Sequence, residues 1–348
     1  MNVALTFNVK PESDTFFELV SSNNSINLNN KIDEFAEWDT CETINAVKDA
    51  LSLYHDVNLI EANYDAFEKL KAIKPDIVFN IAEGYRGFSR ESQIPAMLEM
   101  LNIPFTGSDS LTLGICLDKS RTKEILSYYN IPNSKFFVCE NISQLNTNHF
   151  NYPLFVKPIC EGSSKGIFSS SITNNYVELK REVERVIDVY NQPALIEEFL
   201  TGREFTVAIL GNGSDKKVLP IIEIRFDKYP KDVKPIYSFE TKWILDTKEN
   251  DFDVFDCPAK IEKELEDKII EICLKTYEVL RCKDWSRIDV RLDKDGIPNI
   301  IEINPLPGIM PDPRENSSFP KAARAAGLTY DEMINTVLLS ACKRYNLL

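Results

Sequence analysis

One segment constrains the fold of this chain more than any other: RIDVRLDKDGIPNIIEINP, residues 287–305. Two runs of alternating apolar and polar residues flank the dipeptide Asp295-Gly296, which is a strong signal for a β-hairpin turn. A two-residue loop there would put aliphatic side chains on one face and polar side chains on the other, as a half-buried hairpin requires. The predicted pairs are Arg287 with Asn304, Ile288 with Ile303, Asp289 with Glu302, and Val290 with Ile301.

Two carboxylates, those of Asp289 and Glu302, would face each other across this hairpin. Like charges at directly paired positions are unfavourable unless something compensates them. A divalent cation would do so, because two carboxylates and the amide of Asn304 form an oxygen ligand set suited to Mg²⁺. Alternatively, Arg287 and nearby lysines neutralise the acids on a solvated polar face. The spacing alone supports both interpretations equally.

The first third of the chain alternates short apolar runs with helical patterns. This βαβαβα order predicts a doubly wound parallel sheet, in which ligands bind at the carboxyl ends of the strands. The loop FNIAEGYRGFSRES, residues 79–92, lies at such an end. The expected strands are 2–7, 57–62 and 76–81, and the expected helices are 41–54, 66–73 and 94–102.

The rest of the chain mixes strands and helices without an internal repeat. We therefore expect an α/β (α+β) protein, with a parallel-sheet unit followed by α+β units. The expected helices are 118–129, 176–190, 260–280 and 329–343. The expected strands are 136–140, 153–159, 194–200, 204–210 and 218–226, followed by an irregular stretch over 227–258.

Composition limits the partners of this 348-residue chain. Its net charge of −14 argues against nucleic-acid or anionic-membrane binding, and no apolar run reaches membrane-spanning length. The N-terminus is not a signal peptide, and the eight cysteines are scattered without a CxxC pair, so we expect reduced thiols in a cytoplasmic protein. With only two histidines, a histidine-based zinc site or a Ser/His/Asp triad is not expected.

Two further segments carry candidate ligand contacts. The loop in KPICEGSSKGIF, residues 157–168, contains glycines that allow close backbone approach and N–H groups that could cradle a phosphate, although by itself this composition favours a plain surface turn. The spacing is not that of a P-loop. In IEEFLTGREF, residues 196–205, the acids could bind an adenine amino group and ribose hydroxyls, or could be surface charge.

Taken in order, these segments resemble the ATP-grasp enzymes and, within them, the D-alanine–D-alanine ligases. The resemblance rests on KPxxEGSSxGI, EEFLxGREFTVAIL, RIDVRLDxDG and EINPLPG, on PFTGSDSLTLGICLDKSRTK at 104–123, and on the closing SSFPKAARAAGLTYDEMI. It covers roughly residues 75–348, while the earlier residues match only in pattern. It implies an ATP-grasp fold, with a Rossmann-like domain over 1–115, a central small subdomain over 116–203 and a C-terminal large subdomain over 204–348.

The resemblance also implies roles for individual residues. The nucleotide-binding positions would be Lys119 and Lys157 on the phosphates, Glu161, Gly162, Ser163 and Ser164 in the loop that closes over them, Glu197, Glu198, Phe199 and Leu200 on the adenine-pocket strand, and Glu204 on the ribose. Asp289, Glu302 and Asn304 would hold two Mg²⁺ ions, with Mn²⁺ as an alternative metal. In catalysis, Arg287 would stabilise the tetrahedral intermediate, Gly308 would direct its N–H at the oxyanion, Lys242 would lie on a mobile lid loop, and Ser163 would position the first substrate.

The chemistry implied by the resemblance has two steps. A carboxylate attacks the γ-phosphate of ATP to give an acylphosphate, and an amine then attacks the acylphosphate to give an amide, ADP and phosphate. Positioning and electrostatics supply most of the rate, so no protein nucleophile is needed.

The chain departs from the ligases on the substrate side. Glu37 is the nearest match to a glutamate that contacts the substrate amine, and Glu83 replaces a histidine, with Arg86 and Arg90 added nearby. Trp243 replaces the lid tyrosine, and the loop between Gly308 and the matching Ser317 is longer and contains Arg314. Arg90 and Arg314 would suit an acidic or larger substrate, unless they pair with nearby acids.

These observations favour an ATP-dependent carboxylate–amine ligase that acts on amino acids or a small peptide. The alternatives are an authentic D-alanine–D-alanine ligase and a nucleotide-binding protein that has lost its chemistry. The expected partners are ATP and small carboxylate and amine substrates, and the resemblance also suggests a homodimer.

Overall fold

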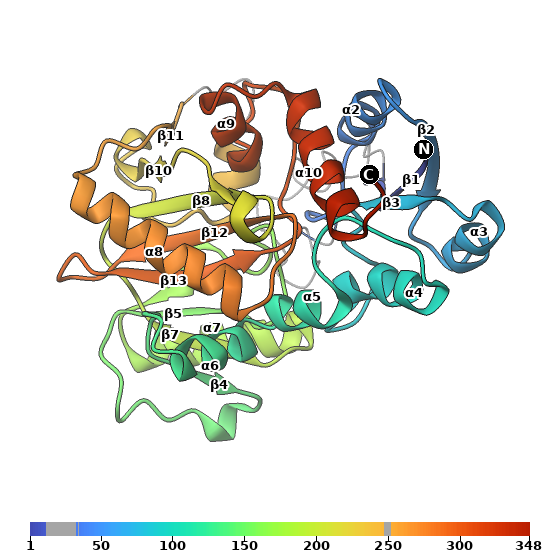
Figure 1. The fold of residues 1–348 in the computed structure, drawn as a ribbon. Helices are drawn as coiled ribbons and strands as arrows, with labels where there is room; N and C mark the ends of the chain where they lie inside the picture. Colours follow the sequence, from blue (N-terminus) through green and yellow to red (C-terminus); the bar gives the residue numbers. More distant parts are fainter. Residues whose placement is uncertain (12–32, 34, 247–251) are drawn as a thin grey trace.

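The computed structural model describes residues 1–11, 33, 35–246 and 252–348. Three β-sheets organise these residues, and helices pack around them (Figure 1). The combination of one parallel sheet, two antiparallel sheets and surrounding helices agrees with the predicted α/β (α+β) class. The predicted domain boundaries remain a prediction, and the one at 115/116 falls inside a helix, α5 (Ser110–Leu117).

The first sheet is parallel, as the sequence pattern predicts. Its order is β2 (Asp56–Glu61), β1 (Asn2–Phe7) and β3 (Ile77–Asn80). The helices of this unit are α2 (Cys41–Ser52), α3 (Ala66–Ile73) and α4 (Gln93–Leu101). The acids of the loop after β3 therefore lie at the carboxyl end of this parallel sheet, where ligands usually bind.

The second sheet is antiparallel, in the order β4 (Phe136–Cys139), β7 (Ala194–Glu198), β5 (Leu154–Pro158) and β6 (Ile172–Thr173). Helix α7 (Tyr176–Tyr190) packs its apolar stripe on this sheet, because Leu179, Val183 and Val186 recur at helical spacing. Asn175 caps the helix by accepting a hydrogen bond from the backbone N–H of Glu178.

The third sheet runs in the order β11 (Phe255–Asp256), β10 (Ile222–Ile224), β8 (Glu204–Leu210), β12 (Trp285–Leu292) and β13 (Pro298–Asn304), with β9 (Lys217–Val218) paired to β8. Helix α8 (Lys263–Val279) packs on one face of this sheet. Helices α9 (Ser318–Ala325) and α10 (Tyr330–Arg344) join the core on the other face, and α10 packs beside α2 (Figure 1). The C-terminal helix therefore ties the third sheet to the first.

The hairpin has the predicted faces but not the predicted loop. Asp293 N–H donates to the carbonyl of Ile297 at 2.9 Å, so the loop holds three residues rather than two, with Gly296 at φ +78°. A β-bulge beyond Asp289 then shifts the register by one residue, and Val290 pairs with Ile300 rather than Ile301. The extra loop residue and the bulge shift the register in opposite directions and cancel. The end of the hairpin away from the loop therefore keeps its predicted pairs, Arg287 with Asn304 and Asp289 with Glu302.

Several other elements differ from expectation. The strand expected at 218–226 is divided between β9 and β10, and the stretch 227–258 contains β11 and a π-helix. Helix α6 (Lys119–Tyr128) was expected, whereas α5 and α9 were not. The short helices are η1 (Arg90–Ser92), η2 (Ile142–Gln144), η3 (Ser169–Ser171), η4 (Gly213–Asp215), η5 (Phe226–Lys228) and the π-helix η6 (Thr241–Leu245).

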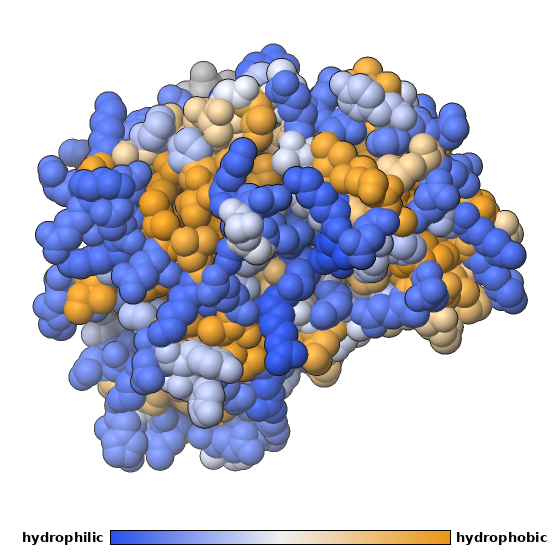
Figure 2. Space-filling view, viewed as in Figure 1, coloured by the Kyte–Doolittle hydropathy of each residue, from blue (hydrophilic) through white to orange (hydrophobic). Residues whose placement is uncertain are grey.

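Hydrophilic residues cover most of the face seen in Figure 2, and hydrophobic residues form smaller patches between them. Within the described ranges, no helix is both long and apolar enough to cross a membrane. All eight cysteines are free thiols.

Candidate active site

A cavity of about 170 Å³ lies between the second and third sheets. Strands β5 and β7 contribute one wall, and β8, β12 and β13 contribute the other. Most of the residues matched to ATP-binding, metal-binding, catalytic and substrate positions line this cavity. They are Lys157, Ser163, Ser164, Glu197, Glu198, Phe199, Leu200, Glu204, Lys242, Arg287, Asp289, Glu302, Gly308 and Ser317.

One side of the cavity is built on a buried cluster around Glu197. Its two carboxylate oxygens pair with Lys123 Nζ at 2.6 Å and Lys157 Nζ at 2.9 Å. Burial alone would raise the pKa of Glu197, but the two lysines lower it to about 2. The cluster holds the Lys157 ammonium in place before any phosphate is bound.

The predicted ribose acid, Glu204, is also paired. Arg291 Nη1 donates to Glu204 Oε2 at 2.7 Å, and both side chains are buried. The Arg291 guanidinium lies 4.6 Å from the centroid of the Phe199 ring, in a cation–π arrangement. Glu204 therefore keeps a defined orientation at the edge of the cavity, with acceptor capacity left for a hydroxyl.

The three proposed metal ligands are adjacent on β12 and β13. Arg287 binds Asp289 through two nitrogens, at 3.1 and 2.9 Å, and Lys119 Nζ lies 2.8 Å from Glu302 Oε1. Asn304 donates to Asp289 Oδ2 at 3.3 Å. Carboxylate and amide oxygens at neighbouring positions fit Mg²⁺, although both acids have basic partners, as the alternative to a metal site predicted.

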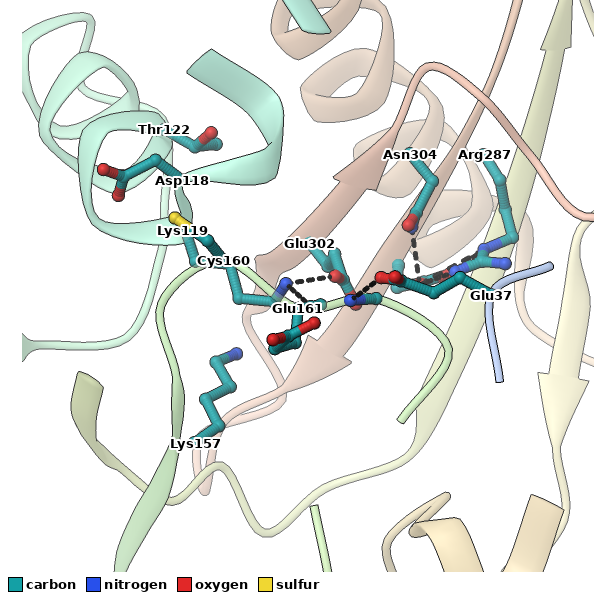
Figure 3. A network of polar contacts seen from close by, with 12 residues as sticks. Glu37, Asp118, Lys119, Thr122, Lys157, Cys160, Glu161, Arg287, Glu302 and Asn304 are labelled. Carbon is teal, nitrogen blue, oxygen red and sulfur yellow. Dashed lines mark hydrogen bonds and ion pairs between the residues drawn. The ribbon is translucent and has the colours of Figure 1, made fainter. Parts of the chain in front are cut away.

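The loop after β5 is fastened to the N-terminal unit. The carboxylate of Glu37 accepts from Gly162 N–H at 2.6 Å, and Arg90 binds the same carboxylate through Nη2 at 2.5 Å and Nε at 3.1 Å. Arg90 also donates to Cys160 O at 2.7 Å and Glu161 Oε2 at 3.0 Å. Figure 3 shows Lys119 between Glu302 and Glu161, whose backbone carbonyl accepts from the lysine.

Tight backbone packing shapes the same loop. Ser163 and Ser164 adopt positive φ angles, and Gly166 has φ +77°. A Cβ atom on Gly166 would lie 2.4 Å from Pro158 Cγ, so only glycine fits this position without movement. The Gly166 N–H donates to Asp33 Oδ2 at 2.8 Å, which is a second contact with the N-terminal unit.

The proposed lid residues sit on the π-helix η6. Trp243 Nε1 donates to Ser163 O at 3.1 Å, and the Ser164 hydroxyl donates to Tyr237 O at 2.7 Å, so the predicted phosphate loop and this segment are in contact. Burial, reinforced by Arg287, lowers the pKa of Lys242 to about 8, although nearby carboxylates oppose the shift. Lys242 can therefore change charge near physiological pH.

The two substrate-side arginines are engaged with acids. Arg90 holds Glu37 and Glu161, and Arg314 is exposed and binds Asp312 at 2.6 Å. Arg314 lines neither of the two cavities that contain Arg287. The argument for an acidic substrate therefore loses its support. Ser317 does reach the site, since its hydroxyl accepts from Met310 N–H and lies 3.3 Å from Gly308 O.

Sequence reasoning missed several residues that shape the site. Lys123 lies one helical turn after Lys119, and Arg291 lies two residues after Asp289 on the same strand, so their spacing could have revealed them. Gln192, which donates to Glu161 Oε1 at 2.6 Å, carries no such local signal. Asp39 and Glu91 likewise reach the site only through the tertiary fold.

Comparisons with known proteins agree with this geometry. The family described as D-ala D-ala ligase C-terminus matches residues 125–339. A D-alanine–D-alanine ligase of Aquifex aeolicus is 34% identical over 302 residues, which cover 85% of this chain and 94% of the relative. The chain belongs to the D-alanine–D-alanine ligase family. As a member of this ATP-grasp family it is an ATP-dependent, ADP-forming ligase.

One further relative and one solved structure resemble this member of the D-alanine–D-alanine ligase family. The uncharacterised protein y4sG of Sinorhizobium fredii is 34% identical over 269 residues, which cover 77% of this chain and 75% of the relative. The solved structure of D-alanine–D-alanine ligase from Bacillus anthracis, complexed with ATP, has a TM-score of 0.71 and 23% identity, and it covers 100% of this chain and 99% of that chain. This likeness supports the ATP-grasp fold.

Proposed function

We propose that this protein is a Mg-ATP-dependent carboxylate–amine ligase that joins amino acids, or an amino acid and a small peptide, through an acylphosphate. One observation carries the proposal: Lys157, Arg287, Asp289 and Glu302 line a single cavity that is also lined by the two acids at the end of β7 and by the apolar residues Phe199 and Leu200 that follow it. This combination suits a triphosphate at one end and an adenine at the other.

The first step transfers a phosphoryl group. A carboxylate oxygen of the first substrate attacks the γ-phosphorus of ATP, the bond from this phosphorus to the bridging oxygen breaks, and ADP leaves. Lys119 and Lys157 supply positive charge to the phosphates. Their ion pairs with Glu302 and Glu197 fix the positions of the two ammonium groups before ATP binds. Magnesium held by Asp289, Glu302 and Asn304, as two ions or replaced by Mn²⁺, would neutralise further phosphate charge.

The second step forms the amide. An amine nitrogen attacks the acyl carbon, the carbon–oxygen bond to the phosphate breaks, and the nitrogen gives up a proton. Arg287 and the N–H of Gly308 would stabilise the oxyanion at that carbon. Ser163 and Lys242 line the same region and would orient the substrate and the phosphate. A homodimeric assembly and a cytoplasmic location remain predictions from the sequence and its resemblance.

The test is release of phosphate and ADP from Mg-ATP with pooled D- and L-amino acids, with products identified by mass spectrometry. The proposal predicts release that depends on an amino acid and a product containing a new amide. Release with D-alanine alone would assign D-alanine–D-alanine ligase activity instead. Nucleotide binding without release for any acid and amine would contradict the proposal and leave a nucleotide-binding protein.

A further inference from the structure

A second cavity, of about 70 Å³, adjoins the nucleotide cavity and shares Ser163, Lys242, Arg287 and Gly308 with it. One wall comes from the third sheet and the chain that follows β13. The opposite wall comes from the N-terminal unit and is acidic. Its carboxylates are those of Glu37, Asp39, Glu83 and Glu91.

The charges of this cavity do not balance. Glu37 is neutralised by Arg90, and Arg287 is taken by Asp289, which leaves Lys242 as the lining cation not in an ion pair among the described residues. The other three acids, Asp39, Glu83 and Glu91, make no side-chain hydrogen bond or ion pair within the described part of the chain.

Among these three acids, Glu91 gives the strongest evidence for a missing positive charge. Its residue is only 9% exposed, it sits on the short helix η1, and it lines the cavity. A buried carboxylate without a partner is unfavourable, so this position calls for a positively charged group in the cavity. Burial raises the pKa of Glu91 to about 8 and that of Asp39 to about 7, so the empty cavity favours their neutral forms, and a bound ammonium group would favour the charged forms.

The missing cation is better explained by ammonium groups than by a metal ion. Among the described residues, no three acidic, histidine or cysteine side chains are grouped closely enough to hold a metal. The acids are instead spread over one wall, so a molecule with several N–H donors can reach more than one of them. A cavity of 70 Å³ holds roughly five to seven water-sized spheres, which limits the molecule to a small amino acid.

We propose that this cavity selects a small diamino acid, of the size of 2,3-diaminopropionate or 2,4-diaminobutyrate, as the substrate whose carboxylate is activated. The inference rests on the proposed ligase function, because Arg287 and Gly308 face the carboxylate while the acidic wall receives the ammonium groups. An amino acid with one ammonium group would, together with Lys242, leave one of the three unpaired acids uncompensated. A second ammonium group on the side chain accounts for it.

The test is calorimetric binding of each enantiomer of these two diamino acids to the full chain, with Mg²⁺ and a non-hydrolysable ATP analogue, and again without nucleotide. Homoserine and serine are the matched ligands, because they replace the side-chain ammonium with a hydroxyl at nearly the same size. We expect one enantiomer of a diamino acid to bind at least about tenfold more tightly than its hydroxyl counterpart, since hydrogen bonds to charged groups are the strong ones.

Two variants test whether the acidic wall causes the preference for a diamino acid. Glu91→Gln and Asp39→Asn each keep the side-chain shape and should reduce the preference for the diamino acid several-fold, while binding of the ATP analogue stays within about twofold. Glu68→Gln, on the exposed face of α3, is the control and should change neither. Two variants are used so that poor folding of one does not decide the outcome.

The failure of this inference is distinguishable from that of the proposed function. Equal binding of diamino acids and hydroxyl analogues, or a preference unchanged in both acidic-wall variants, would overturn the diamino-acid assignment even if the protein forms amides with another amino acid. Absence of nucleotide binding or of any amide product would overturn the ligase proposal, whatever the binding preference.

Discussion

Asp289 and Glu302 occupy directly paired positions on β12 and β13, and each carboxylate is held by a different cation, Arg287 in one case and Lys119 in the other. The two carboxylates are therefore held in defined orientations at the place where phosphate charge would accumulate. Because Lys119 comes from α6 and Arg287 from β12, the pair also links two separate parts of the fold.

Glu302→Gln should reduce turnover by at least about 100-fold, since it removes a proposed metal ligand. Mutating residues that only hydrogen-bond to a metal ligand already reduces activity by up to about 100-fold. The measurement is phosphate release at saturating Mg-ATP, with thermal unfolding to verify the fold. Glu264→Gln, at an exposed position on α8, is the control. Turnover like that of the unmodified protein would remove Glu302 from the metal site.

Glu197→Gln should destabilise the protein by on the order of 3 kcal/mol at neutral pH, because the lowered pKa of about 2, against a usual value of 4.5, measures how strongly Lys123 and Lys157 stabilise the carboxylate. This stabilisation is fully present above pH 4.5 and is lost as pH falls towards 2. Urea unfolding of both proteins across this range gives the comparison. An unchanged free energy of unfolding would show that the cluster contributes nothing net.

ATP affinity of the free protein should weaken as pH rises through about 8, because Lys242, with its pKa lowered to about 8, loses its positive charge there. Lys242→Arg keeps the charge at all these pH values and should flatten the profile. Calorimetric titration of ATP at pH 6.5 to 9.5 measures both. A profile that stays sloped in the arginine variant would assign the titration to another group.

Gly166→Ala should weaken ATP binding by about tenfold, since the added Cβ would meet Pro158 and the position has φ +77°. Gly213→Ala is a matched control: its φ is also positive, at +52°, but nothing lies within 4 Å of an added Cβ. Nucleotide titration of Gly166→Ala measures the loss of binding, and thermal unfolding of both variants separates the steric effect from backbone strain. Equal losses of stability in both would attribute the effect on the fold to strain alone.

The sequence by itself determined much of the local structure. Alternation and the Asp-Gly turn signal predicted the hairpin, its polar face and the pairing of Asp289 with Glu302, because these depend on residues close together in the chain. The βαβ order predicted the parallel first sheet in the same way. The resemblance then pointed to residues that line one cavity in the structure, because their motifs are short and contiguous.

Only the tertiary structure decided which charged groups are neutralised and which are left over. Arg90 suggested an acidic substrate from its position in the sequence, yet the fold places it between Glu37 and Glu161, residues from two distant segments. Glu91, for which the sequence predicted no role, is buried against a cavity. Local sequence patterns carry no information about such partners, because the free energy of a buried charge depends on the groups that packing brings beside it.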